Sequence, residues 1–162
     1  MRLKKVFVLL LTCLLLTGCG KDSRASKALE IADSLGIRES ILLTLEDSYG
    51  GFHGDGDTFV VFQAPGFQPG KDWKEFPLPE NLSIALWDGT LGDVQWGSLL
   101  TDDSGEPIIP ELETGYYYFC DRHSKSTDSS DASSLLGRSS FNFTLAVYDP
   151  DSEKVYYFEK DT

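Results

Sequence analysis

Near the N-terminus, between residues 27 and 35, apolar residues recur at the spacing of one helix face. These positions are Ala28, Leu29, Ile31, Ala32 and Leu35. Gly36 follows them, at the place where a helix commonly ends. We therefore predict a short amphipathic helix with Leu29, Ala32 and Leu35 facing the core.

Five later stretches are rich in β-branched and aromatic residues or alternate between apolar and polar, as strands do. They are 41–45, 58–63, 115–121, 141–148 and 155–158. The stretch 41–45 could instead extend the helix. Because consecutive strands usually pair, we expect an antiparallel meander. The predicted fold class is α+β, with about four or five strands and the N-terminal helix packed on one face. The charged tail 159–162 would then protect the last strand as an edge.

The middle of the chain gives weaker signals. Pro79 and Glu80 favour the start of a helix over 82–87 that buries Leu82, Ala85 and Leu86. A strand through the same residues is the alternative. The prolines of 65–79 and the turn residues of 89–114 indicate irregular connections.

The first twenty residues form a basic start (Arg2, Lys4 and Lys5) followed by an apolar run over 6–16. This run is shorter than the ~20 residues of a membrane-spanning helix and is typical of a secretory signal. The string Leu16-Thr17-Gly18-Cys19 that closes it resembles the lipobox of bacterial lipoproteins. The resemblance implies that Cys19 becomes the first mature residue and carries acyl chains. An ordinary signal peptide with a chance cysteine is the alternative.

This interpretation divides the chain into a signal peptide (1–18), a lipidated Cys19 with a polar tether (19–26) and a single α+β domain (27–162). Without residues 1–18, which hold three of the 14 basic residues and none of the 26 acidic ones, 11 basic residues remain and the formal charge is −15. Such a surface repels nucleic acid and anionic head groups. We therefore expect contact with the lipid bilayer through acylated Cys19, and no nucleic-acid partner.

Only Cys120 remains after Cys13 leaves with the signal and Cys19 takes the lipid. An internal disulfide is then impossible, so the fold must rest on its hydrophobic core.

The first candidate for chemistry is the glycine-rich stretch 46–57, which gathers Asp47, His53, Asp55 and Asp57. Oxygen donors on a flexible loop can surround a hard cation such as Ca²⁺. The stretch has neither the EF-hand pattern nor a zinc spacing. The alternative is a solvated turn that binds no metal. Apart from a divalent cation at this stretch, no cofactor is predicted.

The second candidate is Asp121-Arg122-His123. Arg122 could bind a carboxylate or phosphate. If the protein uses a histidine as a general base, it must be His53 or His123, the two histidines of the chain. Alternatively, Arg122 pairs with a nearby acid. If strands 58–63 and 115–121 are neighbours, His53 and His123 meet at one end of the sheet.

Three segments, 49–56, 115–124 and 141–149, resemble small uncharacterised lipoproteins of Gram-positive gut bacteria. The resemblance implies a lipid anchor on the extracytoplasmic face of the cell membrane and assigns no activity. Our first hypothesis is a non-enzymatic binding module. The alternative is a small hydrolase, metal-assisted or not, that uses His53, Asp55, Arg122 and His123. A third hypothesis is an inhibitor of a basic partner, suited to the acidic surface.

Overall fold

The computed structural model describes residues 23–162 except 50–53, 89, 92–93, 96–97, 103, 125, 127, 129–130, 132–133 and 136–137. The signal peptide, Cys19 and His53 therefore lie outside the described residues. A helix begins at Ser23, so residues 23–26, which the sequence assigned to the tether, are helical.

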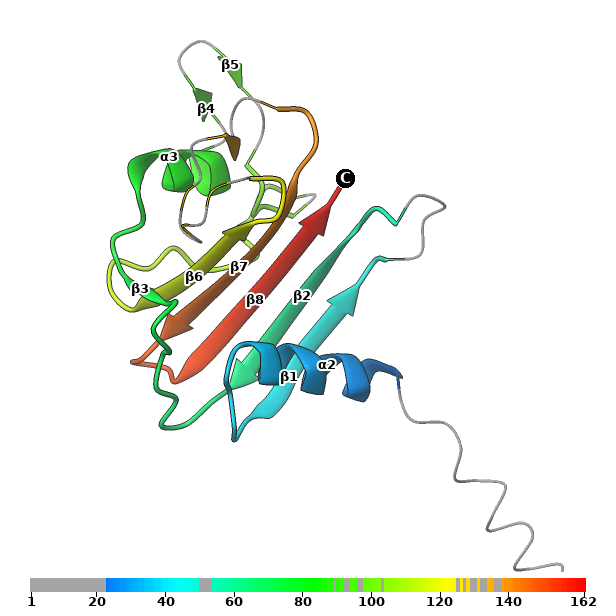
Figure 1. Cartoon of the computed structure of the whole chain (residues 1–162), viewed down its shortest axis with the longest axis vertical. Helices are drawn as coiled ribbons and strands as arrows, with labels where there is room; N and C mark the ends of the chain where they lie inside the picture. The colour runs from blue at the N-terminus through cyan, green and yellow to red at the C-terminus, as the bar shows by residue number, and fades with distance from the viewer. Residues whose placement is uncertain are drawn as a thin grey trace, which may run out of the picture.

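Six strands form one antiparallel sheet in the order β1-β2-β8-β7-β6-β3 (Figure 1). Their bounds are β1 Ile41–Asp47, β2 Gly56–Gln63, β3 Lys74–Glu75, β6 Tyr116–Asp121, β7 Asn142–Asp149 and β8 Lys154–Asp161. The antiparallel sheet and the strands expected from the sequence are confirmed. The expected number of four or five is too low, because the two-residue β3 pairs with β6 and has no alternation from which to predict it.

The chain builds this order from a β1–β2 hairpin and a β6–β7–β8 meander. β2 pairs with β8 over its whole length, from Gly56–Asp161 to Gln63–Lys154. β8 is therefore a central strand and β1 is an edge, so the expectation that residues 159–162 protect an edge is wrong. Strands 58–63 and 115–121 are not neighbours either, because β8 and β7 separate them.

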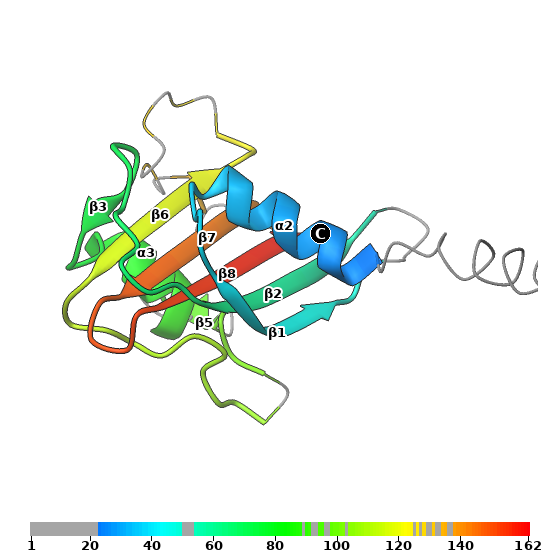
Figure 2. The same ribbon diagram turned by 90° about the horizontal axis from the view of Figure 1, so that it is seen from below.

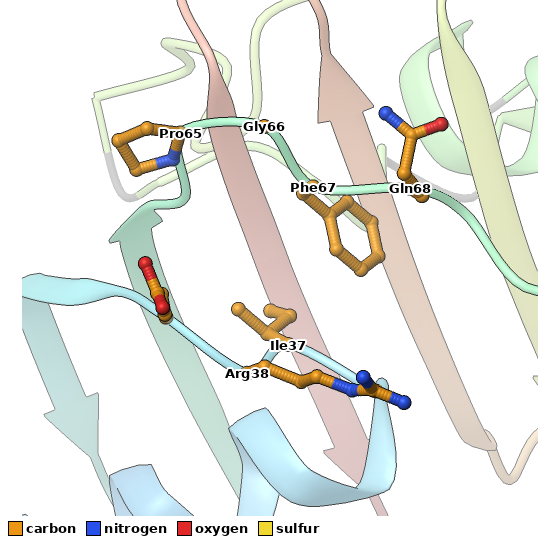
Figure 3. A pocket seen from close by; sticks show the side chains of 8 residues that line it. Ile37, Arg38, Pro65, Gly66, Phe67 and Gln68 are labelled. Carbon is orange, nitrogen blue, oxygen red and sulfur yellow. The ribbon is translucent and has the colours of Figure 1, made fainter.

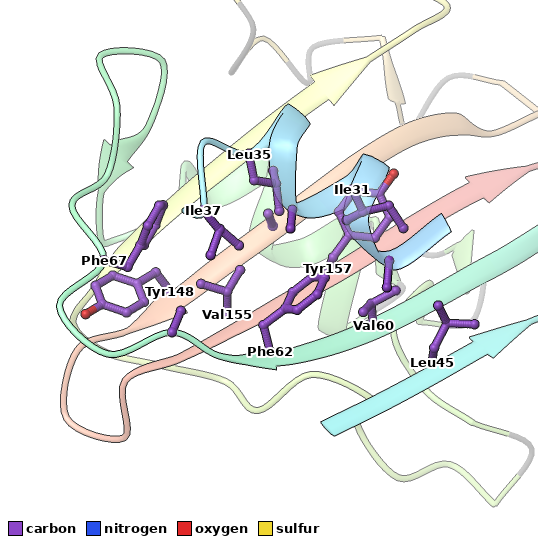
Figure 4. Packing of buried hydrophobic residues seen from close by; sticks show 14 of the residues in the cluster. Ile31, Leu35, Ile37, Leu45, Val60, Phe62, Phe67, Tyr148, Val155 and Tyr157 are labelled. Atoms are coloured by element: carbon purple, nitrogen blue, oxygen red, sulfur yellow. The ribbon is translucent and has the colours of Figure 1, made fainter. Parts of the chain in front are cut away.

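The helix α2 (Ser23–Ser34) crosses one face of the sheet, which we call the α2 face (Figures 1 and 2). Ile31 and Leu35 pack there with side chains from alternate positions of the strands, among them Val60, Phe62 and Tyr157 (Figure 4). The expected helix is confirmed, with one correction: Leu29 is 71% exposed. Ala28 and Ile31 are buried instead, since the helix turns a different side toward the strands.

A second core covers the other face, which we call the α3 face. The short helix α3 (Glu80–Ser83) continues into a π-helical turn, η1 (Ile84–Asp88). The predicted helix and its buried residues Leu82, Ala85 and Leu86 are confirmed. They pack against the odd positions of β7, Phe143, Leu145 and Val147.

Two short strands, β4 (Thr90–Leu91) and β5 (Val94–Gln95), form a separate pair within the predicted irregular region. Among the described residues, no helix combines the length and apolar character needed to cross a membrane.

Candidate functional site

Polar side chains gather around Asp161 on the α2 face, where β8 ends. Arg122 pairs with Asp161, lies 3.2 Å from Glu159 Oε1, and also donates to Thr144 Oγ1. Asn142 Nδ2 donates to Asp161 Oδ1 at 3.0 Å. The guanidinium therefore connects the end of β6 with β7 and β8, and both of its Nη atoms contact groups of the chain itself.

Tyr49 joins this cluster from the connection between β1 and β2. Its hydroxyl donates to Asp161 Oδ2 at 2.6 Å, and its ring lies 4.8 Å below Lys27 Nζ. The backbone of Tyr49 also passes directly over Gly56, where an added Cβ would lie 2.8 Å from Tyr49 Cα. Gly56 thus serves close backbone approach, which only glycine permits here.

The ionisation of these groups follows from their contacts. Burial raises the pKa of Asp161, but the hydrogen bonds from Tyr49, Arg122 and Asn142 and the charge of Arg122 together outweigh it and hold that pKa below its usual value. Burial and the hydrogen bond to Asp161 raise the pKa of the Tyr49 hydroxyl. Asp161 is therefore a carboxylate and Tyr49 a neutral donor at neutral pH.

Lys27 of α2 fastens the helix to the same end of the sheet. Its Nζ lies 2.8 Å from Asp47 Oδ1 and 2.9 Å from Thr58 Oγ1. Thr58 is fully buried and also donates to Asp47 at 3.2 Å. The hydrogen bond from Lys27 lowers the pKa of Asp47. Asp47, a candidate metal ligand in the sequence, thus acts as the partner of a lysine.

The structure does not bring Asp47 and Asp57 together. Asp47 is in register with Thr58, so it shares a face with that residue, and Asp57, one position earlier, lies on the other face. Asp57 binds Lys160 Nζ at 3.0 Å, while Asp55 is exposed. Within the described part of the chain, no three His, Cys, Asp or Glu side chains are grouped to hold a metal ion. Because His53 lies outside that part, the divalent-cation site stays a prediction.

Asp121 forms a separate ion pair, with Arg138. Arg138 Nη1 and Nη2 each lie 2.7 Å from one Asp121 oxygen, and the backbone N–H of His123 donates to the same carboxylate at 3.0 Å. Burial raises the pKa of Asp121, but Arg138 and the hydrogen bonds from His123 and Ser134 together outweigh burial and keep that pKa below its usual value. Nothing in the sequence pattern marked Arg138, because it lies 17 positions from Asp121 in an irregular segment.

His123 has an exposed ring whose Nδ1 lies 3.1 Å from Asn142 Oδ1. Its expected meeting with His53 rested on strands 58–63 and 115–121 being neighbours, a premise that the strand order contradicts. His53 itself lies outside the described residues. The structure does bring one residue from each candidate stretch together, because Tyr49 and Arg122 both contact the carboxylate of Asp161. The alternative in which Arg122 pairs with nearby acids is confirmed.

The most exposed apolar side chains among the described strands lie on the edge strand β1. Ile41 is 64% exposed, Leu42 40% and Leu43 49%. A register shift between Leu42 and Thr44 leaves Leu43 as an extra residue opposite β2. Three consecutive apolar residues of β1 are therefore exposed to solvent, where regular alternation would bury every second one.

A cleft of about 510 Å³ lies beside the start of β1, between segments 36–39 and 65–68 (Figure 3). Ile37 and Phe67 form its buried apolar wall. Arg38, Glu39 and Gln68 line it as exposed polar residues. Segment 36–39, one wall of the cleft, leads directly along the chain into the apolar run of β1.

Comparison of the chain with protein-family models, with curated proteins and with solved structures gives no match.

Proposed function

We propose that this protein is a membrane-anchored, extracytoplasmic binding module that recruits another protein and has no catalytic activity of its own. The observation that carries the proposal is the exposed apolar run Ile41–Leu43 on the edge of the sheet. An edge strand presents unpaired backbone groups, and apolar side chains beside them favour contact with another protein.

The cluster around Asp161 supports a structural rather than a chemical role for that end of the sheet. A catalytic arginine needs donors free for its substrate, and both Nη atoms of Arg122 already contact Asp161, Glu159 and Thr144. The hydrolase alternative would have to displace these contacts before Arg122 could hold a substrate anion.

The anchor rests on the signal pattern and on Cys19. α2 begins at Ser23, four residues after Cys19, so the chain between them spans at most about 14 Å. Arg24 Nη2 donates to the carbonyl oxygen of Leu45. An acyl group on Cys19 would therefore hold the β1 edge close to the membrane, where it meets other membrane-bound proteins.

The anchor is tested by labelling cells with an alkyne analogue of palmitate. We expect label on the wild-type protein and none on Cys19→Ala, which should leave the membrane fraction. A labelled Cys19→Ala variant would contradict the anchor.

Recruitment is tested with a photoreactive amino acid in the full chain. Position 42 on β1 should give discrete protein adducts in cells, and position 75 on the opposite edge strand serves as the matched exposed control. Adducts at neither position, together with hydrolysis of a model ester or peptide that is lost in His123→Ala, would favour the hydrolase instead.

A further inference from the structure

The outer edge of β1 is long enough to hold a short peptide. β1 runs over seven residues, and its first four, Ile41 to Thr44, correspond to about 13 Å of extended chain. Its inner edge is paired with β2, and it ends the strand order of the sheet. Arg24 binds the carbonyl oxygen of Leu45, so the accessible part of the edge is the preceding stretch, Ile41–Thr44.

This accessible part is also the apolar part. Natural edges are commonly protected by lysine, proline or a bulge. β1 has a bulge at Leu43 but bears no charged side chain from Ile41 to Leu45. The bulge hinders indiscriminate pairing, while Ile41, Leu42 and Leu43 offer contact area to a strand that fits it.

Charge distinguishes between the possible occupants. Exposed acids flank the apolar run, Glu39 before it and Glu46 after it. The full chain has a formal charge of −12, so a second copy would bring like charge against like. Anionic lipid head groups are disfavoured for the same reason. Exposed Arg38 adjoins Glu39, so at that end the two charges offset each other. A basic segment gains attraction from Glu46 and from the acidic charge of the chain as a whole.

We propose that the β1 edge, from Ile41 to Thr44, binds an extended, basic segment of another protein, which adds to the six-stranded sheet as a further strand. Main-chain hydrogen bonds would supply affinity, and alternate side chains of the segment would supply specificity. The proposal deepens the proposed function and rests on it, because it names the chemistry of the partner.

The cleft next to β1 gives this segment a place to continue. Glu39 lines the cleft two residues before β1 begins, and Phe67 and Ile37 form its apolar wall (Figure 3). A strand added to β1 would therefore meet Glu39, its neighbour Arg38 and an apolar surface at this end. A basic side chain with an apolar stem, lysine or arginine, suits Glu39 and the apolar wall.

The test uses the full chain, purified with its anchor and placed in nanodiscs of zwitterionic lipid. A displayed library of random heptapeptides is selected on it, and the enriched peptides are synthesised. Binding is then measured for Leu43→Lys and Glu46→Lys. The matched controls are Leu29→Lys, an exposed leucine on α2, and Glu75→Lys, an exposed acid on the other edge strand. Circular dichroism verifies that each variant folds.

We expect enriched peptides in which lysine or arginine alternates with β-branched or aromatic residues. Each β1 variant should weaken their binding by about tenfold, because it sets like charges against each other, and neither control should. Peptides that bind all four variants equally would overturn the β1 proposal and leave the binding function standing. A library without enrichment would count against both.

Two further results would overturn the proposal by naming another occupant. A dimer in sedimentation velocity that Leu43→Lys abolishes would mean that a second copy covers the edge. A fluorophore at position 42 that is quenched by nitroxide lipids in the nanodisc would mean that the membrane covers it.

Discussion

The hydroxyl of Tyr49 donates a 2.6 Å hydrogen bond to Asp161, 112 positions later in the chain. The bond joins the connection between β1 and β2 to the end of the central strand β8. Arg122, the residue after β6, pairs with the same carboxylate. Three segments that are remote in sequence are thus held at one end of the sheet by a single acid.

Tyr49→Phe should lower the free energy of unfolding by about 1 kcal/mol, because it removes one hydrogen bond to a partly exposed carboxylate. Urea unfolding at neutral pH measures the change. Tyr116→Phe is the control, since that ring lies on the same face and stacks on Tyr148. Equal losses in the two variants would contradict a special role for the Tyr49 hydroxyl.

The pH dependence of the Asp161 contacts has a definite sign. The folded-state pKa of Asp161 lies below its ordinary value of 3.8, so its contribution to stability is present above that value and is lost as the pH falls through the folded pKa. Protonation of other acids also changes the stability over this pH range, because it relieves repulsion between them. The quantity to measure is therefore the difference in the free energy of unfolding between the wild type and Asp161→Asn. We expect this difference to be constant from pH 7 to about pH 5 and to shrink below about pH 4. A difference that grows on acidification would contradict the assignment.

Much of the fold follows from local pattern. Phe143, Leu145 and Val147 alternate in sequence and do face one core, since a strand has a two-residue period. The prediction that Leu29 is buried was wrong, because α2 carries apolar residues on more than one side. Only packing on the sheet decides which of these residues is buried.

The polar cluster was not predictable in the same way. Tyr49 lies beside Asp161 because β8 pairs with β2, a pairing between segments about 100 residues apart. One local signal was available. Glu159 and Asp161 continue the alternation of Val155 and Tyr157, which places two acids on the α2 face in line with a buried row.

Arg138→Ala should destabilise the protein more than any change in the Asp161 cluster. The Asp121 side chain is only 1% exposed, and removal of its partner leaves a buried charge unpaired. We expect a loss of about 3 kcal/mol in the free energy of unfolding. Arg38→Ala, at an exposed arginine, should change it by less than about 0.5 kcal/mol. A loss in Arg138→Ala no larger than in Arg38→Ala would contradict the buried pair.

Ca²⁺ and Zn²⁺ should leave the melting temperature of the full chain unchanged relative to a sample with chelator. Asp47 and Asp57 are held by Lys27 and Lys160 on opposite faces, so they cannot share one ion without breaking both pairs. Differential scanning calorimetry gives the measurement. A rise in melting temperature that His53→Ala or Asp55→Asn removes would establish the metal site predicted from the sequence.

Gly56→Ala tests whether backbone contact positions Tyr49. The added Cβ would lie 2.8 Å from Tyr49 Cα and 2.9 Å from its backbone nitrogen, so the connection must move away from β2. We expect a loss of about 1–3 kcal/mol in the free energy of unfolding. Gly70→Ala is the matched control, because its Cβ would meet only Trp73 at 4.0 Å. If displacement of Tyr49 is the cause, Tyr49→Phe added to Gly56→Ala should cost less than Tyr49→Phe alone, since the bond to Asp161 is already broken. Full additivity of the two changes would show that Gly56 acts independently of that bond.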